Sequence, residues 1–138
     1  MDLYTHKVQY YETDRMGITH HSNYIRWMEE ARMDLLDRMG WSYSRLEASG
    51  VGSPVLAVNC RYKHATTYGD TVSIQVRVQE FNGVRLTLWY EMKNAANGEL
   101  VLEGTTEHCF LGKDMRPVRL KKMLPEFYEK LCNEVQNP

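Results

Sequence analysis

The spacing of apolar residues changes once along this chain of 138 residues. Over residues 22–39, apolar side chains recur at steps of three and four, which predicts a helix with one apolar stripe. The stripe consists of Ile25, Met28, Ala31, Leu35 and Met39, and it is widened by Trp27, Met33 and Leu36. From residue 54 onward, apolar and polar residues alternate with a period of two, which predicts strands. This order of elements favours one long, buried helix followed by a sheet.

Five strands are expected in total. Residues 3–12 are rich in Tyr, Val and Thr and predict the first strand. The alternating pattern places the other four at about residues 54–62, 71–79, 84–92 and 99–111. The pairs Asn82-Gly83 and Asn97-Gly98 predict tight hairpins, because both residue types tolerate a positive φ. Short turns of this kind join antiparallel neighbours.

Three further helical signals complete the predicted order. Gly40 is placed to end the long helix, and a short helical turn is expected over residues 42–48. Pro125 begins a C-terminal helix. The residues expected to share one face of that helix are Phe127, Leu131 and Val135.

The predicted fold class is therefore α+β, with a five-stranded antiparallel sheet wrapped around one long helix and a short C-terminal helix. We expect residues 1–138 to form a single domain, since this length suffices for one core and leaves little room for a second. The strand at residues 54–62 is apolar on both faces. A lone chain would then expose an apolar surface, so we expect the sheet to be covered in a homodimer or larger assembly.

Composition narrows the function classes. The formal net charge is −1 and the pI is near 6.5, which gives no electrostatic case for a nucleic acid or membrane partner. Three unevenly spaced cysteines without a Cys-x-x-Cys pair argue against a disulfide framework and a structural zinc site. The N-terminal residues lack the apolar core of a signal peptide, and no apolar run reaches membrane-spanning length. We expect a cytoplasmic protein.

The segment at residues 13–24 carries the chemistry. Asp14 lies in a glycine-containing loop, and a His-x-Asn-Tyr sequence opens the long helix directly after it. A helix N-terminus offers unpaired N–H groups and favours negative charge. A carbonyl between the two would meet a base or nucleophile on one side and an oxyanion donor on the other, which suits acyl transfer. Alternatively, Asp14 and Ser22 are ordinary turn and cap residues.

A longer pattern surrounds this loop and reads Tyr10-Tyr11-Glu12-Thr13-Asp14-x-x-Gly17-x-x-x-His21-x-Asn23-Tyr24. It resembles the signature of the 4-hydroxybenzoyl-CoA thioesterase family, and most closely its small bacterial, YbgC-like acyl-CoA thioesterase branch. Further matches to that branch are Glu29-Glu30-Ala31-Arg32 and Tyr68-Gly69-Asp70. The chain departs from the pattern at Arg15, Met16 and His20, which bears on the shape of the acyl pocket.

The resemblance implies a hot-dog fold and an obligate dimer, often a tetramer, with active sites at the subunit interface. It implies hydrolysis of an acyl-CoA thioester without a metal or redox cofactor, with CoA as part of the substrate. The position matching Asp14 is then the catalytic carboxylate. The position matching His21 lies at the helix N-terminus, where a backbone N–H polarises the thioester carbonyl.

The roles of individual residues follow from thioester chemistry. Asp14 either attacks the carbonyl to form an anhydride or activates a water molecule. The His21 side chain either orients the loop or takes part directly. Gly17, Asn23 and Tyr24 are expected to orient the loop and the substrate. Glu29, on the helix, is a weaker alternative carboxylate, with an ion pair as its other interpretation. The candidates for the phosphates of CoA are Arg61, Lys63 and Arg85, with Lys113 and Arg116 also possible.

Two other function classes remain open at this point. A hot-dog enoyl-CoA hydratase or dehydratase also pairs an acidic residue with a histidine, and Asp14 with His20 or His21 meets that requirement loosely. A non-catalytic acyl-CoA-binding module is the third reading. The sequence leaves open the acyl group and the choice between CoA and carrier-protein thioesters.

Overall fold

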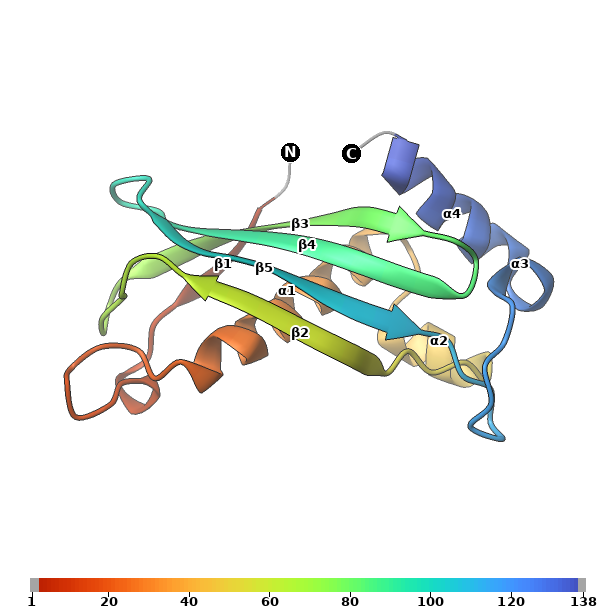
Figure 1. Cartoon of the computed structure of the whole chain (residues 1–138), viewed down its shortest axis with the longest axis horizontal. Helices are drawn as coiled ribbons and strands as arrows, with labels where there is room; N and C mark the ends of the chain where they lie inside the picture. The colour runs from red at the N-terminus through yellow and green to blue at the C-terminus, as the bar shows by residue number, and fades with distance from the viewer. Residues whose placement is uncertain (1–2, 137–138) are drawn as a thin grey trace. The chain divides into compact units, whose positions relative to one another are not determined.

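The computed structural model describes residues 3–136, and it contains a five-stranded sheet in the order β1-β3-β4-β5-β2 (Figure 1). The strands are β1 (Tyr4–Lys7), β2 (Val55–Tyr62), β3 (Thr71–Phe81), β4 (Arg85–Asn94) and β5 (Leu100–Cys109). The helical elements are η1 (Tyr10–Glu12), α1 (Ser22–Arg38), α2 (Tyr43–Ala48), α3 (Leu120–Met123) and α4 (Pro125–Gln136). β1 pairs with β3 in antiparallel register, with Tyr4 opposite Ile74.

Most predicted elements are present within two residues of their expected ends. α1 ends at Arg38, and Gly40 follows it at a φ of +80°. Ser42 caps α2 by accepting the N–H of Arg45. Gly83 and Gly98, the second residues of the two Asn-Gly pairs, have φ values of +92° and +72°. The glycine and serine signals in the sequence therefore predicted these turns and helix ends correctly.

Two expectations need correction, and one short helix was not expected. The first strand ends at Lys7, not at residue 12, because the Glu12 carboxylate accepts the N–H of Gln9 and closes a 3₁₀ turn. In α4, Phe127 and Leu131 are buried but Val135 is exposed, so the apolar face is shorter than expected. α3 was not predicted from the sequence. Within the described residues, no helix is long and apolar enough to cross a membrane.

The chain groups into two compact units. The first takes the chain up to Asp34, with Cys60–Val76 and Tyr90–Gly104. Its helical part packs on the end of β2, since the Cys60 thiol lies 3.7 Å from the Met28 sulfur. The largest buried side chains of this unit are Trp27, Met28, Ile74, Tyr90, Met92 and Leu102.

The second unit takes Leu35–Asn59, Arg77–Trp89 and the chain from Thr105 onward. An aromatic cluster holds α4 in this unit. The Phe127 ring lies 5.2 Å from Trp41 and 5.9 Å from Phe110, measured between ring centroids. Phe127 is fully buried, so it anchors the C-terminal helix.

β2 forms one edge of the sheet and carries apolar side chains that the chain itself does not cover. Val55, Leu56 and Val58 are 48%, 47% and 40% exposed. An apolar strand at an open edge offers unpaired main-chain groups and apolar area together, which is a typical surface for association.

Candidate active site

Asp14 lies in a small hairpin built from main-chain hydrogen bonds. Thr13 and Thr19 form an antiparallel bridge, and the Asp14 N–H donates to the Ile18 carbonyl at 2.8 Å. Gly17 has a φ of +78° and donates its N–H to the Asp14 carbonyl at 3.0 Å. The Asp14 Oδ1 accepts the N–H of Met16 at 2.8 Å. Residue 17 needs a glycine because other residues rarely adopt this φ.

A second segment fastens this hairpin from the side. The Thr19 N–H donates to the Thr66 carbonyl at 2.8 Å, and the two threonine hydroxyls lie 2.7 Å apart. The Thr67 hydroxyl donates to the Gly17 carbonyl at 2.8 Å. Tyr24, from the first turn of α1, brings its hydroxyl within 3.0 Å of the Thr66 hydroxyl. The loop and the start of α1 thus share one buried anchor at Thr66.

The main-chain oxygen of Glu12 holds the other end of the loop. It accepts the His20 N–H at 2.8 Å and the Asn23 side-chain amide at 2.9 Å. The same amide lies 3.3 Å from the His20 carbonyl. Asn23 is buried. Its hydrogen bond to the Glu12 carbonyl joins the beginning of the loop to the start of α1, so it sets the distance between the loop and the helix.

The helix start leaves one main-chain donor exposed. The His20 ring accepts the Ser22 N–H through Nδ1 at 3.2 Å and lies 2.8 Å from the Ser22 hydroxyl. The His21 ring stacks on His20 at 4.4 Å and is exposed. Within residues 3–136, the N–H of His21 makes no backbone hydrogen bond. The geometry therefore presents this N–H as an available donor beside the loop.

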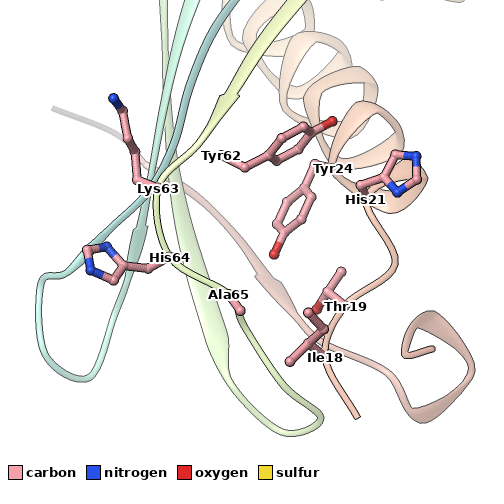
Figure 2. A pocket seen from close by; sticks show the side chains of 8 residues that line it. All are labelled: Ile18, Thr19, His21, Tyr24, Tyr62, Lys63, His64 and Ala65. Carbon is pink, nitrogen blue, oxygen red and sulfur yellow. The ribbon is translucent and has the colours of Figure 1, made fainter. Parts of the chain in front are cut away.

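A cavity of about 200 Å³ opens between the loop, the start of α1 and the end of β2. Its lining includes Ile18, His21, Tyr24, Tyr62 and Lys63. Figure 2 shows the two tyrosine rings on opposite elements, with Ile18 beside Thr19 beyond the hydroxyl end of Tyr24. The ring centroids of Tyr24 and Tyr62 are 5.6 Å apart. Asp14 does not line the cavity. Its N–H is hydrogen-bonded to the carbonyl of Ile18, which does line it.

The other predicted site residues are more scattered. Lys63 lines the cavity, but Figure 2 shows its Nζ pointing away from the tyrosines. Arg61 lies on β2 and is exposed. Glu29 is exposed on α1, two turns from its start. Arg85 begins β4 and belongs to the second unit. The first unit therefore brings together the loop, His21, Tyr24 and the stem of Lys63.

Sequence reasoning missed a buried polar chain beneath the loop. The Glu12 carboxylate accepts hydrogen bonds from His6 Nε2, the Gln9 N–H and Trp27 Nε1, each at 2.8 Å. His6 lies 3.1 Å from Glu30 through its other nitrogen and stacks on Trp27. Glu12 was quoted as part of the family pattern, but nothing in its local spacing assigned it a partner.

The protonation state of Glu12 follows from these contacts. Burial by itself would raise the pKa of the Glu12 carboxyl, but hydrogen bonds from His6, Gln9 and Trp27 outweigh it and hold the pKa below its ordinary value. Glu12 is therefore a carboxylate at neutral pH. On the cavity wall, burial and then neighbouring Cys60 raise the pKa of Tyr62, which stays a neutral phenol.

Over the described range 3–136, no group of three or more His, Cys, Asp or Glu side chains is arranged to hold a metal ion.

The chain is similar to known proteins over most of its length. A family model described as the thioesterase-like superfamily matches residues 8–131. YneP of Bacillus subtilis (strain 168), named as an acyl-CoA thioesterase, is 38% identical over 123 residues, covering 88% of this chain and 88% of YneP. The acyl-CoA thioester hydrolase YbgC of Escherichia coli O157:H7 is 26% identical, covering 86% of this chain and 88% of YbgC.

A solved structure gives the same result for the backbone. The DHNA-CoA thioesterase from Staphylococcus aureus superposes with a TM-score of 0.91 at 33% identity, covering 95% of this chain and 88% of that one. The chain belongs to the thioesterase-like superfamily and has the hot-dog fold, as the sequence resemblance implied. The family match spans the hairpin that carries Asp14, the start of α1 and β2 to β5.

Proposed function

We propose that this protein hydrolyses acyl-CoA thioesters, with Asp14 as the catalytic carboxylate and the His21 N–H as the oxyanion donor. The observation that carries the proposal is the loop itself. The loop residue Asp14 is hydrogen-bonded through its main chain to Ile18, and Ile18 lines the same cavity as His21, whose N–H is an available donor at the start of α1. Relatives that share most of this chain's length are named as acyl-CoA thioesterases.

The carboxylate is prepared for its role by the hairpin. The Met16 N–H fixes one oxygen of Asp14, and the other has no partner within residues 3–136. That second oxygen is available to attack the thioester carbon or to take a proton from water. Direct attack would form a mixed anhydride and release the CoA thiolate, and water would then cleave the anhydride. In the general-base route, Asp14 takes a proton from water as the water oxygen adds to the same carbon, and collapse of the tetrahedral intermediate then breaks the C–S bond and releases the CoA thiolate.

The start of α1 supports the developing negative charge. The thioester oxygen becomes an oxyanion as the carbonyl carbon turns tetrahedral, and a preoriented N–H stabilises it more than the ground state. The helix dipole adds to this effect at the first turn. Loss of one such donor typically lowers the rate by about 10²–10³-fold. The rings of Tyr24 and Tyr62 then border the acyl group.

A dimer completes the proposed site. The apolar residues of β2 are exposed in the single chain, and covering them in a second copy would also extend the sheet across its edge. We propose a homodimer or a tetramer built from such dimers. Arg61, Lys63 and Arg85 remain our proposed contacts to the CoA phosphates, where charge-assisted hydrogen bonds are strong. We further propose that the enzyme is cytoplasmic and needs no cofactor. We also propose that it binds neither nucleic acid nor a membrane.

Two other functions make different demands on the same residues. A hydratase would require a His21 or His20 imidazole acting on the substrate's α- or β-carbon, whereas the His20 ring is bonded to Ser22 at the helix start. A binding module would need no carboxylate poised at the thioester. Thioester hydrolysis uses both the Asp14 carboxylate and the His21 N–H, so we prefer it to the other two functions.

The test is a thiol-release assay across short, long and aromatic acyl-CoAs. We expect Asp14→Asn to lower kcat by several orders of magnitude while the fold and acyl-CoA binding are retained, because size is kept and charge is lost. Glu29→Gln is the matched control and should stay near wild type. If Asp14→Asn keeps more than about a tenth of kcat, a barrier change under about 1.4 kcal/mol, the catalytic role lies elsewhere. Hydration of an enoyl-CoA without thiol release would favour the hydratase.

A further inference from the structure

His6 lies on the inner face of β1. Tyr4 and His6 are partly buried and Val8 is fully buried, whereas the alternating residues Thr5 and Lys7 are exposed. This alternation is the ordinary period of a strand, so position 6 faces the protein interior. The His6 side chain is only 13% exposed. A polar ring at such a position needs hydrogen-bond partners for its two nitrogens.

Two carboxylates meet this ring, one at each nitrogen. His6 Nε2 lies 2.8 Å from Glu12 Oε1, and His6 Nδ1 lies 3.1 Å from Glu30 Oε1. A carboxylate oxygen only accepts hydrogen bonds, and a neutral imidazole has a single N–H. Both contacts are hydrogen bonds only when the ring carries two N–H groups, as an imidazolium. The ring also stacks on Trp27 with centroids 4.5 Å apart, and the face of an indole attracts a cation.

The acidic groups around the ring supply negative charge. Glu12 is ionised at neutral pH, because its hydrogen-bond donors outweigh the effect of burial on its pKa. The Glu30 side chain is 38% exposed, so water also solvates its charge. The Tyr4 hydroxyl donates to Glu30 Oε1 at 2.7 Å. Burial, this hydrogen bond and the charges of Glu30 and Asp34 raise the pKa of Tyr4 to about 12, so Tyr4 stays neutral.

The position of Glu12 bears directly on the catalytic loop. Its carboxylate is fixed by His6 Nε2. Its main-chain oxygen accepts the His20 N–H at 2.8 Å and the Asn23 amide at 2.9 Å. Asp14 follows Glu12 by two residues. A shift of Glu12 is therefore passed on both to Asp14 and to the start of α1.

We propose that His6, as an imidazolium bridging Glu12 and Glu30, is a positioning residue for the loop that carries Asp14. It holds Glu12 in place, and Glu12 holds the loop against the start of α1, so the Asp14 carboxylate and the His21 N–H keep their relative placement. His6 acts through Glu12 and not on the substrate. The positioning role rests on the proposed thioester hydrolysis, whereas the charge of the ring does not.

Two substitutions separate the nitrogens of the ring. The amide nitrogen of His6→Gln takes the place of Nε2, so the donor to Glu12 is retained. The amide nitrogen of His6→Asn takes the place of Nδ1, so the donor to Glu30 is retained and the donor to Glu12 is lost. In a thiol-release assay at pH 7, we expect His6→Gln to keep kcat within about threefold of wild type and His6→Asn to lower it about 10–100-fold. Lys7→Gln removes a positive charge from the exposed face of the same strand and should leave kcat unchanged.

The pH profile gives a readout that a purely structural role would not change. When the ring loses a proton, Glu12 and Glu30 compete for the single N–H that remains, whereas the amide of His6→Gln does not titrate. The contribution of the imidazolium is present at low pH and is lost as the pH rises. The ratio of wild-type kcat to His6→Gln kcat should therefore fall between about pH 6 and pH 9. The groups that face the ring, including Tyr4 and Asp34, are common to both proteins, so their titrations largely cancel in this ratio.

NMR of the wild-type protein tests the same proposal without an activity assay. Correlation spectra of the His6 ring should show both nitrogens protonated at pH 7. The proposal is wrong if the ring is neutral, if the kcat ratio does not change with pH, or if the Gln and Asn variants lose kcat equally while circular dichroism is unchanged. If His6→Asn does not fold, the ring spectrum and the kcat ratio still decide.

Failure of the proposed function is distinguishable from failure of this inference. If the wild-type protein releases no thiol from any acyl-CoA, thioester hydrolysis is excluded. The positioning of the loop is then measured by hydrogen exchange of the His20 N–H, which donates to the Glu12 carbonyl. His6→Asn should speed this exchange and His6→Gln should not. Equal exchange rates in the two variants would overturn the positioning role.

Discussion

Glu12→Gln replaces a buried carboxylate with an amide of nearly the same size. Glu12 is 5% exposed, and its two oxygens accept three donors: His6 Nε2, the Gln9 N–H and Trp27 Nε1. An amide has one oxygen. Whichever way the amide is turned, at least one of the N–H groups from Gln9 and Trp27 faces its NH₂ group and loses its acceptor.

The expected cost follows from these contacts. A buried donor left without an acceptor costs about 1–3 kcal/mol. The hydrogen bonds that survive lose their charge assistance, which adds about 1 kcal/mol. We therefore expect the free energy of unfolding to fall by about 3 kcal/mol. For a chain of this length that corresponds to a melting temperature lower by roughly 10 °C.

The pH dependence gives an independent check. The pKa of Glu12 is lower in the folded protein than in the unfolded chain, so its stabilisation is fully present above the unfolded pKa of about 4.3. It is lost as the pH falls through the folded pKa. Because Gln does not titrate, the difference between wild type and Glu12→Gln should be largest at pH 7 and shrink at acid pH.

The assay is urea unfolding followed by tryptophan fluorescence, at one fixed protein concentration because association contributes to stability. Glu47→Gln changes an exposed residue of α2 and should shift stability by less than about 0.5 kcal/mol. A loss below about 1 kcal/mol for Glu12→Gln at pH 7 would refute the reasoning. So would a difference that persists unchanged below pH 3.

Three further changes test the site and the assembly. His21→Ala keeps the main-chain N–H, so kcat should fall only about 10–100-fold. His21→Pro removes this donor and should abolish thiol release. If the Ala variant is as inactive as Asp14→Asn while its circular dichroism is unchanged, the imidazole takes part directly in the reaction. Asn23→Ala removes the amide that ties the loop to α1 and should lower both stability, by about 1–2 kcal/mol in urea unfolding, and kcat. Leu56→Asp places a charge on exposed β2 and should convert a dimer to monomers in light scattering, while Met115→Asp on an exposed loop should not; equal masses for wild type and Leu56→Asp would exclude β2 as the interface.

Patterns within a few neighbouring residues were enough to predict the long helix and the hairpin turns. The apolar stripe predicted α1, and the two Asn-Gly pairs predicted the hairpins, because each signal acts over a few neighbouring residues. The first strand was predicted too long, because a side-chain acceptor at Glu12 captured the Gln9 N–H and overrode the strand propensity of the tyrosines. Strand propensity says nothing about such a competing hydrogen bond.

The candidate site was predictable in part for the same reason. Asp14, His21 and Asn23 stand close together in the sequence, so a pattern could find them. The anchors of the loop come from distant segments: Thr66 contacts Thr19 and Tyr24, and Trp27 contacts Glu12. Pairing across such separations depends on how the strands and α1 come together, which no local spacing records.

The hydrogen bonds that hold the hairpin carrying Asp14 use no side chain of Arg15 or Met16, and both of these side chains are exposed at its tip. The identity of the side chains at positions 15 and 16 therefore does not determine where the Asp14 carboxylate lies. Variation at the tip can reshape the rim around the carboxylate without moving the carboxylate itself. In evolutionary terms, such a loop is a tolerant place to acquire a new acyl preference, and a library randomised at these two positions is a direct way to select for one.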